Sequence, residues 1–501
     1  MKMKYTRCFA ILIALLIPML GLFGWNNVQN ALADSQTYSN TCHFALTDAL
    51  GLNGYDMSSL GIGGYLNWGT SRPSSLPANI EHTKVLRVRD DVYPTTLNNL
   101  TATVQSNPDQ VWIIGNEPDV KHGGQDNLLP EVYAARFYTL RNRIKLLDPD
   151  AKVGFGPISQ PTPIRIRYLN RILDRLDDPD LAGSRPAALA LIDIYTTHAF
   201  IVNEQPDSWG AGIPPGFDND YSDAENYPGT QQSDFDRTHD INVFIERVVR
   251  LRQWMAGLGE QNKPLWITEY GSLLTPIPPP GYPPQSWNVP DSVTKDYMED
   301  TFDFMLGTEG ISTTVGYPGD DYRMVQRFYW YSLNEYRYIF GGSLFDPTTR
   351  QRTIVGDGYV NYVANPAWFN PTNQDVYVKQ VTIYPLGYTP GTNKTRVDYR
   401  LEVDLSNYHL MDLLTNVVVE FSVDNTPVLP NEPLSLPRCG GSGKTSFNWT
   451  NVDPNDTYDL KIEADYQPYE SETDHDLNNN LWQLTFEAYE PLQIFLPLIR
   501  R

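Results

Sequence analysis

The chain has 501 residues, of which 41% are hydrophobic and 12% aromatic. This length exceeds what one hydrophobic core usually supports, so two or more domains are expected, and the composition excludes a chain that is disordered throughout. The formal net charge is −22, which repels phosphate backbones, so we expect no nucleic-acid partner.

The N-terminal segment has the pattern of an export signal. Small residues suited to a cleavage site stand at Ala31 and Ala33, after an apolar run over residues 9–23 that is preceded by three basic residues, Lys2, Lys4 and Arg7. A single membrane anchor is the alternative, but Pro18 and the shortness of the run argue against a spanning helix. We therefore expect residues 1–33 to be a signal peptide and the mature protein to be secreted, with attachment to the cell surface left open.

Two cysteines remain after the predicted cleavage, Cys42 and Cys439. Two thiols in an exported protein can form a disulfide, which here would tie the start of the mature chain to its C-terminal region, but the sequence leaves the pairing open. No cluster of residues has the spacing of a structural zinc site, so we expect neither a metal nor a cofactor.

Short apolar segments alternate with amphipathic ones, such as Pro130–Leu147, from about residue 61 to residue 332, which is typical of a parallel α/β domain. Seven strands are visible, and the eighth that a closed barrel needs would fall between Arg89 and Val111, where the strand pattern is weak. We predict a (β/α)8 TIM barrel over residues 34–370, with an open sheet as the alternative. The seven visible strands are Gly64–Trp68, Val85–Arg89, Val111–Gly115, Val153–Gly156, Ile192–His198, Leu265–Thr268 and Arg327–Ser332.

Two long segments, 202–240 and 274–290, follow predicted strands and carry aromatic residues among Gly, Pro and Asp. On a barrel they would rise from the carboxyl-terminal face, where loops build active sites, so we interpret them as walls of a cleft rather than as linkers. The aromatic residues include Trp209, Tyr282 and Trp287.

The character of the sequence changes after about residue 370. Segments rich in Val, Tyr and Thr alternate in polarity, and no clear helix separates them. Residues 371–501 therefore predict a smaller all-β sandwich domain. Its visible strands are Val376–Tyr384, Thr395–Leu405, Val417–Val423 and Tyr458–Ala464.

Two glutamates stand at the ends of predicted buried strands. Glu117 follows Val111–Gly115 within Asn116-Glu117-Pro118, and Glu269 directly follows Leu265–Thr268. Alternation along each strand predicts that both side chains point into the barrel, where they can converge over its mouth. Cleavage of a glycosidic bond requires such a pair, one carboxylic acid for the leaving oxygen and one carboxylate for the anomeric carbon.

The tripeptide alone is a weak signal, because Asn431-Glu432-Pro433 repeats it in a polar segment that we interpret as a turn. A lone glutamate at a strand end is more often an ion-pair partner or a solvated loop residue. The interpretation depends on the whole constellation, in which two strands separate the glutamates and two further side chains, His198 and Trp330, end neighbouring strands.

This constellation resembles clan A glycoside hydrolases, in particular families 128 and 39, over about residues 61–370. The resemblance implies Glu117 as acid/base at the end of the fourth strand and Glu269 as nucleophile at the end of the seventh. It also implies that Asn116 binds the sugar 2-hydroxyl, with a local backbone cap as the alternative role. His198 would be a polar group of the site, with a core histidine as the alternative. The C-terminal stretch from Trp449 to Asn480 resembles a CARDB immunoglobulin-like domain.

Three more side chains complete the predicted site. Trp330 would be a platform for the apolar face of a sugar, with core packing as the alternative. Arg87 or Arg89 would keep Glu269 ionised, although a salt bridge facing the helices is equally compatible with their positions. Tyr270 either contacts substrate or packs in the core, because it directly follows Glu269 in the sequence and so faces the opposite side of the strand.

Together these observations predict a secreted, retaining glycoside hydrolase that acts on a β-linked polysaccharide or oligosaccharide. We expect it to cut bonds inside the glycan rather than at its end. We expect a monomer whose C-terminal domain contacts the cell surface or a glycan. The competing hypothesis is a barrel that binds glycan without cutting it and serves adhesion. An esterase or protease lacks support, because neither Gly-x-Ser-x-Gly nor His-Glu-x-x-His occurs.

Overall fold

The computed structural model describes residues 42–77, 80–108, 110–121, 123–206, 210–225, 236–277, 288–320, 322–364, 376–407, 414–430, 433–436, 442–466, 481–489 and 491. Several predicted features lie outside these residues: the signal peptide, Cys439, Asn431-Glu432 and the loop aromatics Trp209, Tyr282 and Trp287. The chain forms two compact units, and the boundary between them falls between Asn370 and Pro371.

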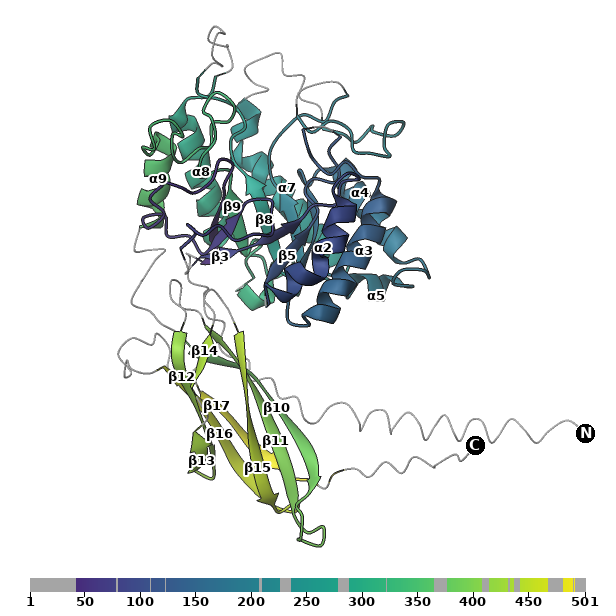
Figure 1. Ribbon diagram of the computed structural model, residues 1–501, viewed down its shortest axis with the longest axis vertical. Helices are drawn as coiled ribbons and strands as arrows, with labels where there is room; N and C mark the ends of the chain where they lie inside the picture. The colour runs from purple at the N-terminus through teal and green to yellow at the C-terminus, as the bar shows by residue number, and fades with distance from the viewer. Residues whose placement is uncertain are drawn as a thin grey trace, which may run out of the picture. The chain divides into compact units, whose positions relative to one another are not determined.

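The N-terminal unit is a mixed α/β structure around a nearly closed parallel barrel (Figure 1). Nine strands hydrogen-bond in the order β3-β2-β1-β9-β8-β7-β6-β5-β4, where the sequence predicted eight. Thr83 alone separates β3 from β4, the two strands at the ends of this order. The strands are β1 Phe44–Thr47, β2 Gly64–Leu66, β3 Glu81–His82, β4 Lys84–Leu86, β5 Val111–Ile114, β6 Lys152–Ile158, β7 Ile194–His198, β8 Leu265–Tyr270 and β9 Arg327–Trp330.

The predicted strand between Arg89 and Val111 is wrong, because helix α2 occupies Tyr93–Gln105. Proline in its first turn presets the helical backbone, and Leu100 and Val104, one turn apart, are its buried residues. The barrel instead begins with β1, which the sequence analysis did not identify and which pairs with both β2 and β9. Because β1 takes the place of the missing strand, Glu117 still follows the fourth strand of the barrel if β3 and β4 are counted together.

Helices follow most strands and surround the barrel (Figure 1). Proline stands in the first turn of α2, α3, α4 and α5, where a missing N–H costs nothing. Side-chain caps start two others: Asp240 accepts the N–H of Asn242, and Thr353 accepts that of Gly356. The remaining bounds are α3 Pro130–Leu147, α4 Pro163–Leu176, α5 Arg185–Leu189, α7 Ile241–Gly257, α8 Asp291–Leu306, α9 Ile354–Val363, and the short η2 Arg237–His239, η3 Thr308–Gly310 and η4 Pro318–Asp320.

The strands of the barrel are buried on both faces, as parallel strands usually are. A small inner cluster fills the barrel with Ala45, Leu66, Val85, Ile113, Ile194, Trp266 and Tyr329. A larger outer cluster joins the opposite faces of the strands to the helices. The polar side chains at the ends of the strands lie outside these two apolar clusters, so a functional site is expected there.

The C-terminal unit consists of two antiparallel sheets, β10-β11-β15 and β13-β12-β16-β17, with β14 paired to β12 (Figure 1). Apolar side chains from both sheets share one hydrophobic cluster, which includes Val403, Phe421, Trp449 and Trp482. The bounds are β10 Val376–Tyr388, β11 Val397–Asn407, β12 Leu414–Val423, β13 Thr426–Pro430, β14 Leu434–Leu436, β15 Ser442–Val452, β16 Thr457–Tyr466 and β17 Leu481–Glu487.

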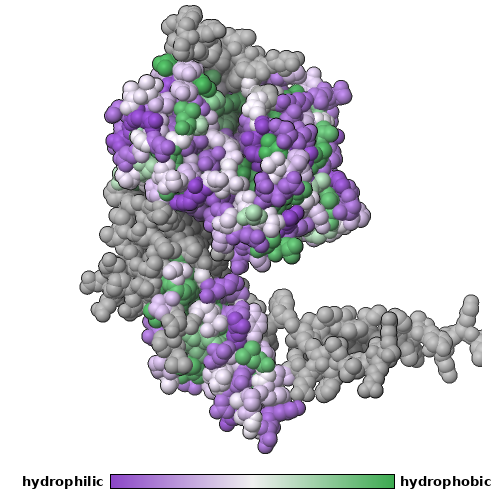
Figure 2. Space-filling model, in the orientation of Figure 1, coloured by the Kyte–Doolittle hydropathy of each residue, from purple (hydrophilic) through white to green (hydrophobic). Residues whose placement is uncertain are grey.

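The visible surface is mainly hydrophilic, with small scattered apolar patches (Figure 2). Among the described residues, no helix has both the length and the apolar character needed to cross a membrane. Cys42 takes part in a disulfide, as the sequence allowed. The partner proposed for it, Cys439, belongs to a segment that the structure does not describe.

Candidate active site

Three predicted side chains meet at the carboxyl ends of strands β5, β7 and β8 of the barrel. Glu117 follows β5, His198 is the last residue of β7, and Glu269 lies near the end of β8. His198 and Glu269 are directly paired in the ladder between β7 and β8. All three side chains are largely buried, with 8%, 1% and 6% of each residue exposed, so their charges act on one another with little screening.

The imidazole of His198 bridges the two carboxyl groups. Its Nδ1 lies 2.9 Å from Glu117 Oε1, and its Nε2 lies 3.3 Å from Glu269 Oε1. These contacts fit an imidazolium between two carboxylates. They also fit a neutral imidazole whose Nδ1 accepts a hydrogen bond from a protonated Glu117, while its Nε2 faces an ionised Glu269.

Glu269 reaches this position because the alternation of β8 is interrupted. Ile267 packs in the outer cluster and Trp266 in the inner one, so strict alternation would turn Glu269 toward the helices. Irregularities in the register of β8, against β7 and against β9, shift the pattern after Ile267. The prediction that regular alternation along this strand turns Glu269 into the barrel is thus wrong, although the side chain of Glu269 does reach the mouth.

A tryptophan that the sequence analysis did not place in the site binds the predicted nucleophile. Trp68, just after β2, donates its indole N–H to Glu269 Oε1 at 2.5 Å. Oε1 therefore has two neighbours, Trp68 and His198, whereas Glu269 Oε2 has no hydrogen-bond partner among the described residues. The carboxylate is anchored through one oxygen, and the other remains available.

The surroundings set the protonation of the site. Burial raises the pKa of Glu269 to about 7, and the neighbouring charge of Glu117 adds to this effect. His198, the Trp68 hydrogen bond and Arg87 act in the opposite direction. Burial alone would lower the pKa of His198, but the charges of Glu269 and Glu117 outweigh it and raise that pKa. Both shifts favour the protonated forms of Glu269 and His198.

The backbone that presents Glu117 is tightly constrained. Glu117 has a left-handed φ of 43°, a conformation that costs a residue other than glycine about 1–3 kcal/mol. Gly115 has φ 90°, and a Cβ there would lie 2.9 Å from the ring of Tyr133. The carboxylate of Asp126 accepts the N–H of Asn116 at 2.7 Å and that of Val88 at 3.2 Å, which fixes the loop against β4.

Two other predicted residues lie near the pair without contacting it directly. The amide of Asn116 donates to Gln125 Oε1 at 2.7 Å, so its role toward a sugar hydroxyl stays a prediction. Arg87 Nε donates to Asp126 Oδ1 at 2.8 Å, and its charge still favours the ionised form of Glu269. Arg89 pairs with Asp91 instead, so Arg87 is the arginine that acts on Glu269.

Trp330 and Tyr270 both pack in the core, which is the alternative that the sequence left open for each, and not against the mouth of the barrel. Trp330 is fully buried, its N–H donates to Gly342 O at 2.7 Å, and its ring packs among the helices, so no sugar can stack on it. Tyr270 is equally buried and meets Trp330 edge to face at 5.3 Å. Both residues belong to the outer faces of their strands, which also explains why they pair with each other in the ladder between β8 and β9.

Tyr331, the residue directly after β9, is the aromatic side chain that does reach the site. Its ring lies 5.9 Å from that of Trp68. Burial raises the pKa of Tyr331, and the charges of Glu269 and Glu117 raise it further. Tyr331 belongs to an apolar cluster at the barrel mouth with Val120, Phe200, Val202 and Ala211, against which Trp68, Leu273 and Phe340 pack. The half-buried Trp68 and Phe340 are therefore the better candidates for contact with a sugar face.

No protein-family model matches the chain. No curated protein matches it either. Among solved structures, a GH128 (subgroup VII) oligosaccharide-binding protein from Cryptococcus neoformans aligns with 68% of this chain and 98% of its own, at 13% identity and a TM-score of 0.40. A glucosidase from Croceicoccus marinus aligns over 83% and 94% at 8% identity and 0.39. A CARDB domain from Pyrococcus furiosus covers 24% of this chain and 97% of its own at 17% identity and 0.19. At this degree of likeness none of them bears on the reaction.

The site's own composition suits acid–base chemistry. It contains two carboxyl groups, one imidazole that connects them, and aromatic side chains at the rim. Among the described residues there is no group of three or more His, Cys, Asp or Glu side chains suited to a metal ion. The arrangement can therefore hold and transfer a proton.

Proposed function

We propose that the protein is a secreted, retaining glycoside hydrolase that cleaves β-glycosidic bonds of a polysaccharide or oligosaccharide by double displacement. The observation that carries this proposal is the bridge of Glu117 and Glu269 by His198 at the ends of β5, β7 and β8. Paired carboxyl groups at the carboxyl-terminal face of a barrel are the equipment that glycoside cleavage requires.

The productive proton arrangement has a protonated Glu117 and an ionised Glu269. In this state the carboxyl O–H of Glu117 donates a hydrogen bond to Nδ1 of His198, and Nε2 of His198 lies 3.3 Å from Glu269 Oε1. A bound glycoside offers its bridging oxygen in place of Nδ1 as the acceptor of that proton. Burial raises the pKa of Glu269 to about 7, so the ionised carboxylate that attacks forms as pH rises through neutrality.

The first step forms a bond between Glu269 Oε2 and the anomeric carbon. The bond from that carbon to the leaving oxygen breaks, and the oxygen takes the proton of Glu117. In the second step water gives a proton to Glu117 and attacks the anomeric carbon, which releases Glu269. Trp68 and His198 both hold Oε1, so the oxygen that attacks is the other one, Oε2.

The substrate that fits the charge of the chain is neutral or cationic. A net charge of −22 and two carboxyl groups in the site disfavour an acidic polysaccharide. Aromatic residues at the mouth are suited to the apolar faces of sugars. Secretion is proposed from the N-terminal signal pattern, and it is tested by sequencing the N-terminus of the mature protein, which we expect to begin at Asp34.

The decisive experiment compares wild type with Glu269→Gln on β-glucans, mannans, xylans and chitosan. We expect wild type to release reducing sugar from one of them and the variant to lose more than about 1000-fold of that activity. Glu260→Gln is the matched control, because Glu260 precedes β8 at the opposite end of the strand, where it accepts from the hydroxyl of Tyr195 at 3.2 Å. Binding of a glycan without cleavage by wild type would contradict the proposal and favour the non-catalytic alternative.

The stereochemical course tests the retaining mechanism separately. Proton NMR of the first product is expected to show the anomeric configuration of the substrate. Azide is expected to restore activity to Glu269→Ala and to give a glycosyl azide of inverted configuration, because the small anion occupies the place of the carboxylate. An inverted product from wild type would show that Glu269 activates water instead.

A further inference from the structure

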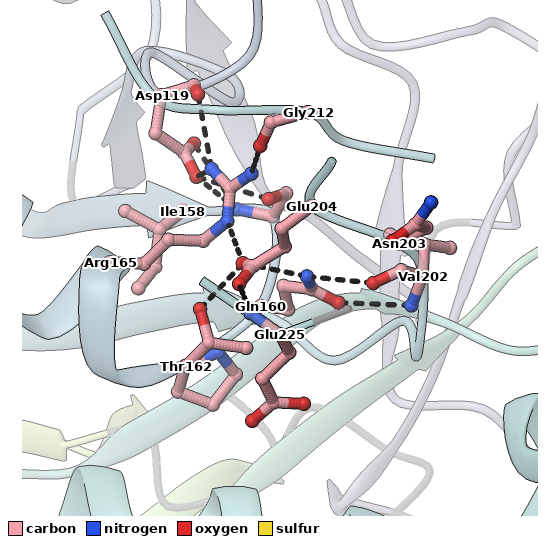
Figure 3. A network of polar contacts seen from close by, with 12 residues as sticks. Asp119, Ile158, Gln160, Thr162, Arg165, Val202, Asn203, Glu204, Gly212 and Glu225 are labelled. Atoms are coloured by element: carbon pink, nitrogen blue, oxygen red, sulfur yellow. Dashed lines mark hydrogen bonds and ion pairs between the residues drawn. The ribbon is translucent and has the colours of Figure 1, made fainter. Parts of the chain in front are cut away.

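Arg165, on α4, forms a buried connection between two loops of the site (Figure 3). It is fully buried, and its guanidinium donates to the carboxylate of Asp119 and to Asp119 O at 3.0 Å, to Glu204 Oε1 at 2.8 Å and to Gly212 O at 2.8 Å. Asp119 lies in the loop after β5, whereas Glu204 and Gly212 lie after β7. One side chain thus joins the loop of Glu117 to the loop that follows His198.

On the Glu117 side, Asp119 is the anchoring point. It lies two residues after Glu117 and is fully buried. Besides Arg165, its carboxylate accepts the N–H of Ser159 at 3.1 Å and the hydroxyl of Ser159 at 3.0 Å. These contacts attach the loop to the end of β6, where Pro157 O also accepts the N–H of Glu117 at 3.0 Å.

Glu117 therefore stands between two fixed points. Asp126 holds the N–H of Asn116 on one side, and Ser159 and Arg165 hold Asp119 on the other. The left-handed φ of 43° at Glu117 persists only while its surroundings impose it. If the anchor at Asp119 loosens, the backbone of Glu117 can relax, and its carboxyl group then leaves His198.

On the His198 side, the carboxylate of Glu204 is saturated with donors (Figure 3). Its Oε1 accepts from Arg165, from Gln160 Nε2 at 2.8 Å and from Thr162 Oγ1 at 2.6 Å, and its Oε2 accepts the N–H of Glu225 at 2.7 Å. The loop that Glu204 fixes carries Phe200 and Val202, which pack against Tyr331 and its neighbours at the mouth. The same guanidinium thus keeps this wall and the loop of Glu117 in register.

On the basis of the proposed function, we propose that Arg165 is a positioning residue, which through Asp119 holds the acid/base Glu117 in the geometry that protonates the leaving oxygen. Lysine cannot replace it, because only the planar fork of arginine spans Asp119, Glu204 and Gly212 at once. Arg165 touches neither of the two carboxyl groups of the site in any described contact.

This role predicts a dependence on the leaving group. A poor leaving group needs the proton of Glu117, whereas 2,4-dinitrophenolate departs without it. We expect Arg165→Lys to lower kcat for the phenyl β-glycoside of the cleaved disaccharide unit by about 10- to 100-fold, as a general acid contributes about 100- to 10,000-fold. For the 2,4-dinitrophenyl glycoside of the same unit we expect a loss in glycosylation of less than about threefold. A purely structural defect would lower both rates by the same factor.

Two further variants complete the test. Arg175→Lys is the control on the same helix, because Arg175 forms its ion pairs with Asp178 and Asp180 at the surface, and it should leave both rates unchanged. Ser159→Ala removes one hydroxyl donor to Asp119 and keeps the ion pair, so it serves if Arg165→Lys does not fold. We expect it to show the same selectivity, about two- to fivefold. Equal losses on both glycosides in these variants overturn the inference.

A readout that does not need turnover separates this inference from the proposed function. The ring-nitrogen NMR signals of His198 report its contact with Glu117. We expect Arg165→Lys to move them and Arg175→Lys to leave them in place. If wild type cleaves neither glycoside but the signals move, the proposed function fails while the positioning of Glu117 stands. Signals that do not move in Arg165→Lys overturn the positioning itself.

Discussion

Replacing Trp68 with phenylalanine should change the pH dependence of the reaction more than its maximum rate. The change removes the indole N–H that Glu269 Oε1 accepts at 2.5 Å and keeps an aromatic ring near Tyr331. That hydrogen bond lowers the pKa of Glu269, which burial raises to about 7. Without it the carboxylate is less stable, so the pKa of Glu269 rises and the ionised nucleophile becomes scarcer at acidic pH.

The size of the effect follows from the strength of the bond. A hydrogen bond to a charged group contributes about 1.5–3 kcal/mol, and Trp68 is half-buried, so the lower end of this range applies. At about 1.36 kcal/mol per pH unit, the acidic limb of kcat/KM should move up by about one pH unit. If the acidic limb of wild type lies near pH ~7 and that of the variant about one unit higher, the ratio of kcat/KM, variant to wild type, is about one tenth at pH ~6. It is about one half at pH ~8.

The assay is the initial rate of aryl glycoside cleavage, well below KM, from about pH 5 to about pH 9. Trp254→Phe is the control, because it removes a comparable indole hydrogen bond, to Asn170 at 2.8 Å, from helix α7 in the outer layer. Its pH profile should coincide with that of wild type. A loss that is equal at every pH in Trp68→Phe, or an acidic limb that moves down, would refute the reasoning.

Three further predictions concern stability. The pKa of Glu269 in the folded protein, about 7, exceeds its ordinary value of 4.5, so the stability that it contributes is complete below pH 4.5 and is lost as pH rises through 7. This loss amounts to about 3 kcal/mol at about 1.36 kcal/mol per unit, and we expect Glu269→Gln to gain Tm relative to wild type between about pH 5 and about pH 8 in calorimetry. Trp330→Ala should destabilise the barrel unit by about 3–5 kcal/mol in urea unfolding. The milder change Trp330→Phe should leave KM unaltered, whereas a tryptophan that stacked on a sugar would raise KM when replaced. Gly115→Ala should cost at least about 1 kcal/mol, because alanine is strained at φ 90° and its Cβ would press on Tyr133; a Tm equal to that of wild type would contradict this.

The sequence allowed the main side chains of the site to be found, because strand ends are marked by local pattern. Apolar runs that stop at Pro118 and at Glu269 locate two strands and the edge at which they end. The identity of the inward face was not predictable in the same way. Both faces of these strands are buried, so Trp330 and Tyr331 are equally plausible from composition, and only the structure shows that Tyr331 reaches the mouth.

Other parts depend on contacts that no local pattern encodes. The sequence predicts Trp68 at the end of a strand, yet its backbone leaves the strand with φ 54° and its indole binds a residue 201 positions later. Arg165 looks like an ordinary helical arginine until Asp119 and Glu204 are brought to it from two different loops. The four residues of β1 stand beside a long N-terminal segment, and they are too few for alternation to distinguish a strand.

The interruption at Thr83 has a consequence for the behaviour of the chain in solution. An open parallel sheet exposes two outer strands whose unsatisfied N–H and C=O groups can recruit other molecules into aggregates. Here the two outermost strands, β3 and β4, are consecutive pieces of one short stretch, and Thr83 N donates to Tyr65 O at 2.9 Å while Val85 N donates to Gly69 O at 3.0 Å. The polypeptide itself thus closes the junction between β3 and β4, which leaves other strands little room to pair there.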